Sequence, residues 1–252
     1  MILTTLLALV ALLPAAPVTG PTGDDTGDRA VIAEQMPTYP LDVCLVSGEP
    51  LGDGAVNAVH DGRLARFCCS RCAGKLESDP EKFIDQVDAA VVRAQSKDYP
   101  LESCPLKGKP LNDRARDVVV GTRLVKVCCT SCERVVKGDP TKAMAALDAA
   151  YIRAQQADYP MDVCLVSGEP LGDEPLDVLY GNMLIRLCCK GCKKEYAKAP
   201  AAFADKVAMR KARAARAGEH GGRKGGDHGD GHDGGGRGEH GGRGDHDGDH
   251  DG

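Results

Sequence analysis

The chain has 252 residues, of which 27% are charged and only 4% are aromatic, and its formal net charge is −5. A mild negative charge argues against a general nucleic-acid binder, because such proteins carry clustered Lys and Arg. With three Phe and no Trp, the chain has little apolar bulk for one large core, and small units of about 60 residues usually need metal ions or disulfides for stability.

The N-terminal segment 1–20 is typical of a secretory signal. Its apolar run from Ile2 to Leu13 is too short to span a bilayer but suits the hydrophobic region of such a signal. The competing interpretation is a frayed apolar tail or a misplaced start codon. We expect an exported protein, periplasmic or secreted, with residues 21–36 as a polar linker and no membrane span further along the chain.

One cysteine pattern occurs three times at an interval of 60 residues. Each copy has one cysteine followed, 24 positions later, by a Cys-Cys-x-x-Cys cluster. The pattern accounts for all twelve cysteines, which are Cys44, Cys68, Cys69 and Cys72, then Cys104, Cys128, Cys129 and Cys132, then Cys164, Cys188, Cys189 and Cys192. A fixed period indicates tandem modules, which we place at residues 37–96, 97–156 and 157–217.

The first half of each module predicts a tight β-knuckle and a short strand. A Pro lies four residues before the first cysteine, and the glycines at 48, 108 and 168 allow the positive φ that a tight turn needs. Alternating apolar and basic residues then predict a strand over 64–67, 124–127 and 184–187. This strand leads directly into the Cys-Cys pair.

The second half of each module predicts a helix. Asp79-Pro80 and Asp139-Pro140 are typical helix starts, because the carboxylate caps free amides and Pro fits the first turn. The third copy has a weaker start, Ala199-Pro200. Apolar residues at 83, 87 and 91 form the stripe of an amphipathic helix. We therefore expect a small α+β fold of three tandem, treble-clef-like modules, each a β-hairpin plus helix, joined by amphipathic helices.

The spacing of the cysteines favours metal ligands. Cysteines three or four apart on the first turn of a helix, such as Cys69 or Cys68 with Cys72, project from one face. The positive N-terminus of a helix stabilises the thiolate form that a metal requires. Cys44 would close the site from the knuckle, so that metal binding contributes to folding.

The motif Tyr-Pro…Cys…Gly, the strand, the Cys-x-x-x-Cys spacing and Asp-Pro-x-Lys-Phe together resemble the TRASH and YHS group of small metal-binding modules, over about 180 residues of the chain. The resemblance implies a treble-clef fold and a role in heavy-metal sensing, trafficking or resistance. It also implies three ligands per module, namely Cys44, Cys68 and Cys72, then Cys104, Cys128 and Cys132, then Cys164, Cys188 and Cys192.

The chain departs from that pattern three residues after the first cysteine. Many relatives have a second cysteine there, where this chain has Ser47, Lys107 and Ser167. Four sulfurs, the number that a structural zinc site prefers, would be completed by Cys69, Cys129 and Cys189. Three thiolates alone would suit Cu(I). We therefore expect zinc, with copper as the alternative.

Two other interpretations of the cysteines stay open. An exported chain with an even number of cysteines is expected to be oxidised, so each module could hold two disulfides. A catalytic thiol would need a histidine, and the one outside the tail, His60, is replaced by Val120 and Tyr180 in the other copies. Without an acid–base set or a phosphate-binding loop, we expect no enzyme.

The tail, residues 218–252, consists almost entirely of Gly, His, Asp, Glu and Arg. Because it has no apolar surface to bury, it is predicted to be disordered. Six histidines among acidic residues would form weak sites for zinc, nickel or copper, at His220, His228, His232, His240, His246 and His250. The competing interpretation is a solvated low-complexity tail without function.

These features predict an exported, non-enzymatic protein that binds a thiophilic metal ion in each of three modules, for storage, buffering or trafficking. Metal ions are its expected partners, nucleic acid is not, and a protein partner is left open. The alternative is an exported structural or interaction protein whose modules are held together by structural zinc or disulfides.

Overall fold

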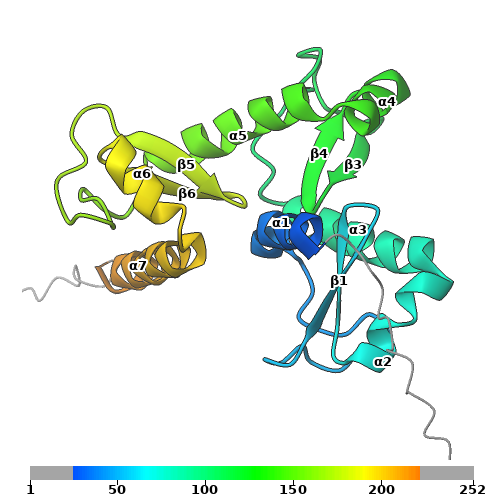
Figure 1. Cartoon of the computed structure of the whole chain (residues 1–252). Coiled ribbons are helices and arrows are strands. Elements are labelled where there is room, and N and C mark those ends of the chain that lie inside the picture. The colour runs from blue at the N-terminus through cyan, green and yellow to red at the C-terminus, as the bar shows by residue number, and fades with distance from the viewer. Residues whose placement is uncertain (1–24, 222–252) are drawn as a thin grey trace, which may run out of the picture. The chain divides into compact units, whose positions relative to one another are not determined.

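The computed structural model describes residues 25–221, and this part of the chain is a small α+β structure with three two-stranded hairpins and seven α-helices (Figure 1). The predicted signal segment 1–20 and the tail beyond Gly221 lie outside the described residues. All three cysteine clusters belong to one compact unit that ends at Ala212, and a second unit begins at Arg213.

Each module contains one antiparallel hairpin. The strands are β1 (Val56–His60) and β2 (Arg63–Phe67), β3 (Arg116–Val120) and β4 (Arg123–Val127), and β5 (Leu176–Tyr180) and β6 (Met183–Leu187). In the first hairpin, the turn residues Asp61 and Gly62 have φ of 48° and 72°, the positive values that suit the twist of a tight hairpin. The predicted strands correspond to β2, β4 and β6, whereas their partners β1, β3 and β5 carry no clear sequence pattern.

The predicted knuckle is confirmed in all three modules. In the first, the backbone amide of Cys44 donates to the carbonyl of Glu49 at 2.7 Å, and the amide of Gly48 donates back to the carbonyl of Cys44 at 2.9 Å. Gly48 has φ of 72°, which explains why a glycine stands there. Isolated β-bridges between residues 43 and 50, 103 and 110, and 163 and 170 close the three knuckles.

The helices that follow the Cys-Cys pairs begin directly after the second cysteine. They are α2 (Ser70–Ala73), α4 (Thr130–Gly138) and α6 (Lys190–Tyr196). In the first module a short 3₁₀ turn, η2 (Leu76–Ser78), continues from α2. The last cysteine of each cluster therefore lies in the first turn of a helix, as its spacing predicts.

The amphipathic helices are α3 (Pro80–Gln95), α5 (Thr141–Gln156) and α7 (Pro200–Gly221). The carboxylate of Asp79 accepts from the backbone amide of Lys82 and so caps α3 as predicted. Helix α5 begins one residue later than its Asp-Pro pair predicts, at Thr141, whose amide donates to Asp139. Helix α7 extends to Gly221 and so includes the first residues of the stretch 218–252 that the sequence predicts to be disordered.

Residues 21–36 are more than a linker. Helix α1 (Asp25–Gln35) and a 3₁₀ turn, η1 (Met36–Thr38), occupy most of this range, and α1 packs on β1 and β2. Gln35 at the end of α1 is only 6% exposed. The polar composition of this range conceals the helix, because much of what α1 contributes to the fold is a buried amide rather than a broad apolar face.

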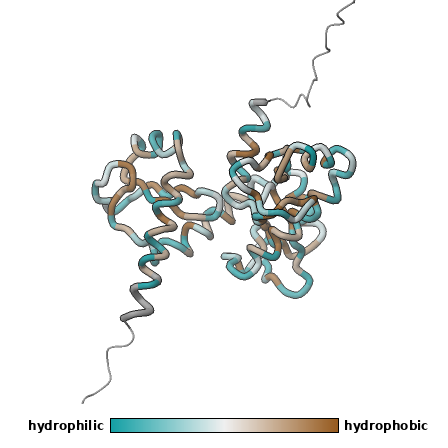
Figure 2. The backbone as a smooth tube through the Cα atoms, turned by 90° about the horizontal axis from the view of Figure 1, so that it is seen from below, coloured by the Kyte–Doolittle hydropathy of each residue, from teal (hydrophilic) through white to brown (hydrophobic). Residues whose placement is uncertain are grey.

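Each module has a small core beneath its hairpin, and the first and last cysteines of the cluster belong to it. In the middle module these are Cys104 and Cys132, which are packed with Val125, Val127 and Leu147. Figure 2 shows short hydrophobic stretches alternating with hydrophilic ones along the backbone. The clusters are thus placed by the same packing that holds the hairpin to its helices.

Candidate metal centre

Three cysteine sulfurs converge in every module. Their Sγ atoms all lie within 4.8 Å of one another in the triads Cys44, Cys68 and Cys72, then Cys104, Cys128 and Cys132, then Cys164, Cys188 and Cys192. The knuckle supplies the first sulfur, the residue after the second hairpin strand supplies the next, and the first helical turn supplies the last. These residues are the ones that the resemblance to metal-binding modules implies.

The separations within a triad suit a metal ion. The Sγ atoms of Cys68 and Cys72 are 3.8 Å apart, and the equivalent pairs are 3.9 Å apart in the middle module and 3.5 Å apart in the third. Four sulfurs around a zinc ion at about 2.3 Å would be separated by about 3.8 Å, the edge of the tetrahedron. The sulfurs of each triad are therefore close enough together to hold a metal ion.

The fourth cysteine of each module lies beside the triad. The Sγ of Cys69 is 3.9 Å from that of Cys68. The Sγ of Cys129 is 3.9 Å from that of Cys128 and 3.7 Å from that of Cys132. Cys189 accepts a hydrogen bond from the backbone amide of Cys192 at 3.5 Å. These sulfurs remain predicted fourth ligands.

The first three ligand candidates have the same order of burial in all three modules, whereas the fourth cysteine is exposed in the outer modules and partly buried in the middle one. The first and last, such as Cys44 and Cys72, are buried, and the strand-end cysteine Cys68 is half-buried. Cys69 and Cys189 are exposed. Each cluster thus has a buried side against the core and an open side toward solvent.

The residue three positions after the first cysteine of each module lies at this open side. The hydroxyl of Ser47 is 3.4 Å from the Sγ of Cys68, and that of Ser167 is 3.4 Å from the Sγ of Cys188. In the middle module the ammonium Nζ of Lys107 is 3.9 Å from the Sγ of Cys129. A hydroxyl or ammonium donor here stabilises a thiolate.

The cysteine thiols of one cluster differ in pKa. Burial by itself would raise the pKa of Cys44, but hydrogen bonds from the Ser47 hydroxyl and from backbone amides lower that pKa to about 6. Burial and the neighbouring sulfurs raise the pKa of Cys72 to about 12. The third module repeats the pattern, with about 6 for Cys164 and about 12 for Cys192. Sulfurs this close oppose one another's ionisation, so a bound cation is what would stabilise the whole set as thiolates.

A tyrosine holds the strand that delivers each Cys-Cys pair. The hydroxyl of Tyr39 accepts from the backbone amide of Arg66 at 3.0 Å, and Tyr99 and Tyr159 do the same for Lys126 and Arg186. Each donating amide belongs to the residue two positions before the Cys-Cys pair. The Tyr-Pro motif is visible in the sequence, but only the structure shows that its tyrosine fixes the strand next to the ligands.

Other candidate residues lie away from the clusters. His60 is at the turn end of β1, opposite Arg63 in the register and at the far end of the hairpin from Cys68, and it pairs with Asp61 at 3.6 Å. The histidines at 228, 232, 240, 246 and 250 lie outside the described residues, as does the side chain of His220. The structure therefore does not test the weak sites predicted in the tail.

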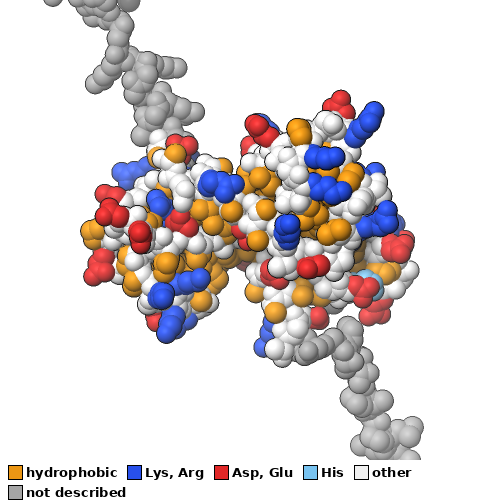
Figure 3. Space-filling view, turned by 90° about the horizontal axis from the view of Figure 1, so that it is seen from above, with side chains coloured by type: hydrophobic (Ala, Val, Ile, Leu, Met, Phe, Trp, Pro, Cys, Tyr) orange, Lys and Arg blue, Asp and Glu red, His pale blue; other side chains and the backbone are white. Residues whose placement is uncertain are grey.

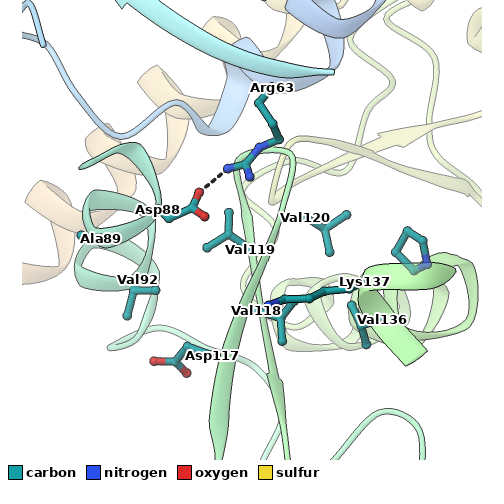
Figure 4. Close-up of a pocket in the computed structure, with 11 residues that line it drawn as sticks. Arg63, Asp88, Ala89, Val92, Asp117, Val118, Val119, Val120, Val136 and Lys137 are labelled. Atoms are coloured by element: carbon teal, nitrogen blue, oxygen red, sulfur yellow. Dashed lines mark hydrogen bonds and ion pairs between the residues drawn. The ribbon is translucent and has the colours of Figure 1, made fainter. Parts of the chain in front are cut away.

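Four hollows in the described part of the chain have no cysteine in their lining. Figure 4 shows one between α3, β3 and α4, where Arg63 points toward Asp88 above a floor that includes Val118 and Val136. On the face in Figure 3, basic and acidic side chains are interspersed, so that face presents no continuous basic surface of the kind that nucleic acid binds.

The twelve cysteines are all unpaired in the structure. Their closest Sγ–Sγ separations, 3.5 to 3.9 Å, are well beyond the length of a disulfide, about 2 Å. The fold and the site together define a class: a small α+β protein with three repeated cysteine clusters, each able to hold a metal ion.

The chain matches no protein-family model, no curated protein and no solved structure. Within residues 25–221, no helix combines the length and the apolar character needed to cross a membrane.

Proposed function

We propose that this protein binds three thiophilic metal ions, one in each module, for storage, buffering or delivery. The observation that carries the proposal is the convergence of three Sγ atoms within 4.8 Å in all three modules. Chance clustering of cysteines would not repeat with the same spacing, the same elements and the same order of burial. The proposal includes export of the protein, a function without catalysis, and a kinship with the TRASH and YHS modules.

Zinc is our first choice of metal, and copper is the second. A fourth sulfur lies close to each triad, and four thiolates are the set that zinc prefers in closed sites. The knuckle, hairpin and helix around each cluster support a treble-clef-like arrangement of the ligands. If the fourth sulfur does not bind, the remaining three thiolates form a set that Cu(I) accepts.

The residues around each cluster have separate roles in this proposal. The knuckle amides and the helix N-terminus orient and stabilise thiolates, and the tyrosine holds the strand between them. A bound divalent ion would supply the positive charge that lets neighbouring sulfurs ionise together. Because the clusters belong to the small cores, ion binding would also contribute to the stability of the fold.

Elemental analysis and thiol counting test the proposal directly. The full chain, purified from the compartment in which it resides, is expected to contain three tightly bound ions. After denaturation in the presence of a chelator, all twelve cysteines should react as free thiols. A protein without metal and without free thiols would instead establish the disulfide alternative.

The second candidate function is a structural or interaction protein whose modules are stapled by structural zinc. The observation that favours it is the exchange of side-chain hydrogen bonds between consecutive modules, such as that of Arg123 with Asn182 at 2.8 Å. The lability of the metal separates the two functions. A trafficking protein should give up ions to a competing chelator while part of its structure persists, whereas a stapled scaffold should unfold as the ions leave.

A further inference from the structure

The middle module differs from its neighbours at the position that faces the cysteines. Residues 47 and 167 are serines, and their neutral hydroxyls lie 3.4 Å from a sulfur. Residue 107 is a lysine, and its ammonium lies 3.9 Å from the Sγ of Cys129. The middle cluster thus has an ammonium group where the other two have a hydroxyl.

The fourth cysteine differs between modules in the same way. Cys129 is partly buried and has two sulfur neighbours, at 3.7 and 3.9 Å. Cys69 and Cys189 are exposed. The fourth cysteine is therefore less exposed to solvent in the middle module than in the outer two.

The charge of Lys107 should affect how tightly the fourth thiolate is held on a bound ion. A divalent zinc ion with four thiolates carries an excess charge of about −2, which weakens the hold on the outermost sulfur unless a nearby group offsets it. Lys107 offers such an offset to Cys129. Cys69 and Cys189 have a serine at the corresponding position and stand open to a competing ligand.

We propose, on the basis of the function proposed above, that the chain has two kinds of metal site. The middle module holds a closed site, and the outer modules hold exchangeable sites in which a thiol displaces Cys69 or Cys189. In that exchange the incoming thiol binds the ion as a thiolate, its proton passes to the departing cysteine, and no electron is transferred. The exchange partners are thus thiol ligands.

Zinc release from the full chain tests this inference. The zinc-loaded protein is mixed with excess colorimetric chelator, with and without an added small monothiol. Two ions should leave in a phase that the monothiol accelerates, and the third should leave about tenfold more slowly without that acceleration. If all three ions leave in one phase, the inference is wrong although the three-ion function stands. If no ion is bound, the proposed function itself fails.

Substitution of Lys107 tests the role of its charge. Lys107→Ser gives the middle module the hydroxyl of its neighbours, and the slow phase should become about fivefold faster at low salt. The effect should shrink at high salt, because an exposed ammonium is screened. Lys109→Ser, in the same knuckle, is the matched control and should leave the slow phase unchanged. An unchanged slow phase in Lys107→Ser would overturn the role of the lysine.

Labelling of the unsubstituted protein avoids any effect of mutation on folding. The zinc-loaded chain is treated briefly with a maleimide, and the modified cysteines are identified by peptide mass spectrometry. Cys69 and Cys189 should react before Cys129. Equal reaction of the three cysteines would show that their sites do not differ in access.

Discussion

At the scale of single residues, the tyrosine before each knuckle connects the core with the cysteine cluster. Tyr99 is partly buried, and its hydroxyl accepts the backbone amide of Lys126 at 2.9 Å. The ammonium of Lys126 lies 5.9 Å from the centre of the same ring. The residue therefore orients the second hairpin strand through both its hydroxyl and its aromatic face.

The first prediction concerns this hydroxyl. Tyr99→Phe should lower the free energy of unfolding by about 1 kcal/mol, because the amide of Lys126 loses its acceptor. Urea unfolding at neutral pH with saturating zinc measures the change. A variant as stable as the natural protein would show that water replaces the hydroxyl without cost.

The second prediction concerns alkaline pH. Burial raises the pKa of Tyr99 to about 12, against the partial effect of the hydrogen bond from Lys126, and Tyr39 is raised to about 12 in the same way. An unfolded tyrosine titrates near pH 10. Because the folded pKa is the higher one, the neutral hydroxyl stabilises the fold fully below about pH 10, and this contribution is lost as the pH rises toward 12.

Unfolding measured from pH 9 to 11 checks the sign and the source of this loss. The stability of the natural protein should fall over this interval, and the double variant Tyr39→Phe with Tyr99→Phe should lose less over the same range. An equally steep fall in the variant would assign the pH dependence to other groups.

At the scale of elements, each hairpin is clamped by the helix that precedes it. The side-chain amide of Gln35 donates to the carbonyl of Gly62 at 2.6 Å and accepts from the amide of Leu64 at 2.9 Å. Gln95 and Gln155 make the equivalent pair of bonds with the next two hairpins. The glutamine thus pairs two backbone groups at the hairpin turn that would otherwise be left without partners inside the packing.

The third prediction tests this clamp in the range that the sequence predicts to be a linker. Gln35→Ala should destabilise the protein by about 1 to 3 kcal/mol, because two partly or fully buried backbone groups lose their partner. Glu34→Ala, at the exposed neighbouring position, is the matched control and should change stability by less than about 0.5 kcal/mol. Similar effects of the two substitutions in thermal unfolding would contradict the clamp.

At the scale of the compact unit that contains the clusters, consecutive modules pack against one another. Helix α3 packs on β2 of its own hairpin and on β3 and β4 of the next, and Leu124 forms one buried cluster with Val87 and Val91. The hydroxyl of Thr122 in the second hairpin turn donates to the carbonyl of Gln35 at 2.6 Å. Consecutive modules therefore share helices, and the loss of one should weaken its neighbours.

The fourth prediction separates the clusters from the tail. Deletion of residues 222–252 should leave three tightly bound ions and an unchanged unfolding transition, since all twelve cysteines lie before this range. Weak additional binding by the full chain should decline as the pH falls through about 6.5, where imidazole becomes protonated. Isothermal titration of both proteins with zinc at pH 7.5 and 5.5 measures this. Loss of tight binding on deletion would place the principal sites in the tail.

The sequence by itself determined the features that depend on local chemistry and on repetition. The period of 60 residues, the knuckle glycines, the strands before the Cys-Cys pairs and the cap of Asp79 on α3 follow from spacing and from neighbouring residues. The spacing also predicted that the knuckle cysteine meets cysteines of the helical turn, but it left Cys68 and Cys69 both open, and the choice of Cys68 came from the resemblance to TRASH and YHS modules.

The tertiary structure alone decided what depends on contacts between distant residues. The polar composition of helix α1 does not predict its packing. That packing depends on the hydrogen bond from Gln35 to the carbonyl of Gly62, 27 residues away in a hairpin turn. The opening of Cys69 to solvent and the approach of Lys107 to Cys129 are likewise set by packing. Identical cysteine spacing specifies the same ligands three times, but the surroundings of each sulfur arise from side chains that only the folded chain brings together.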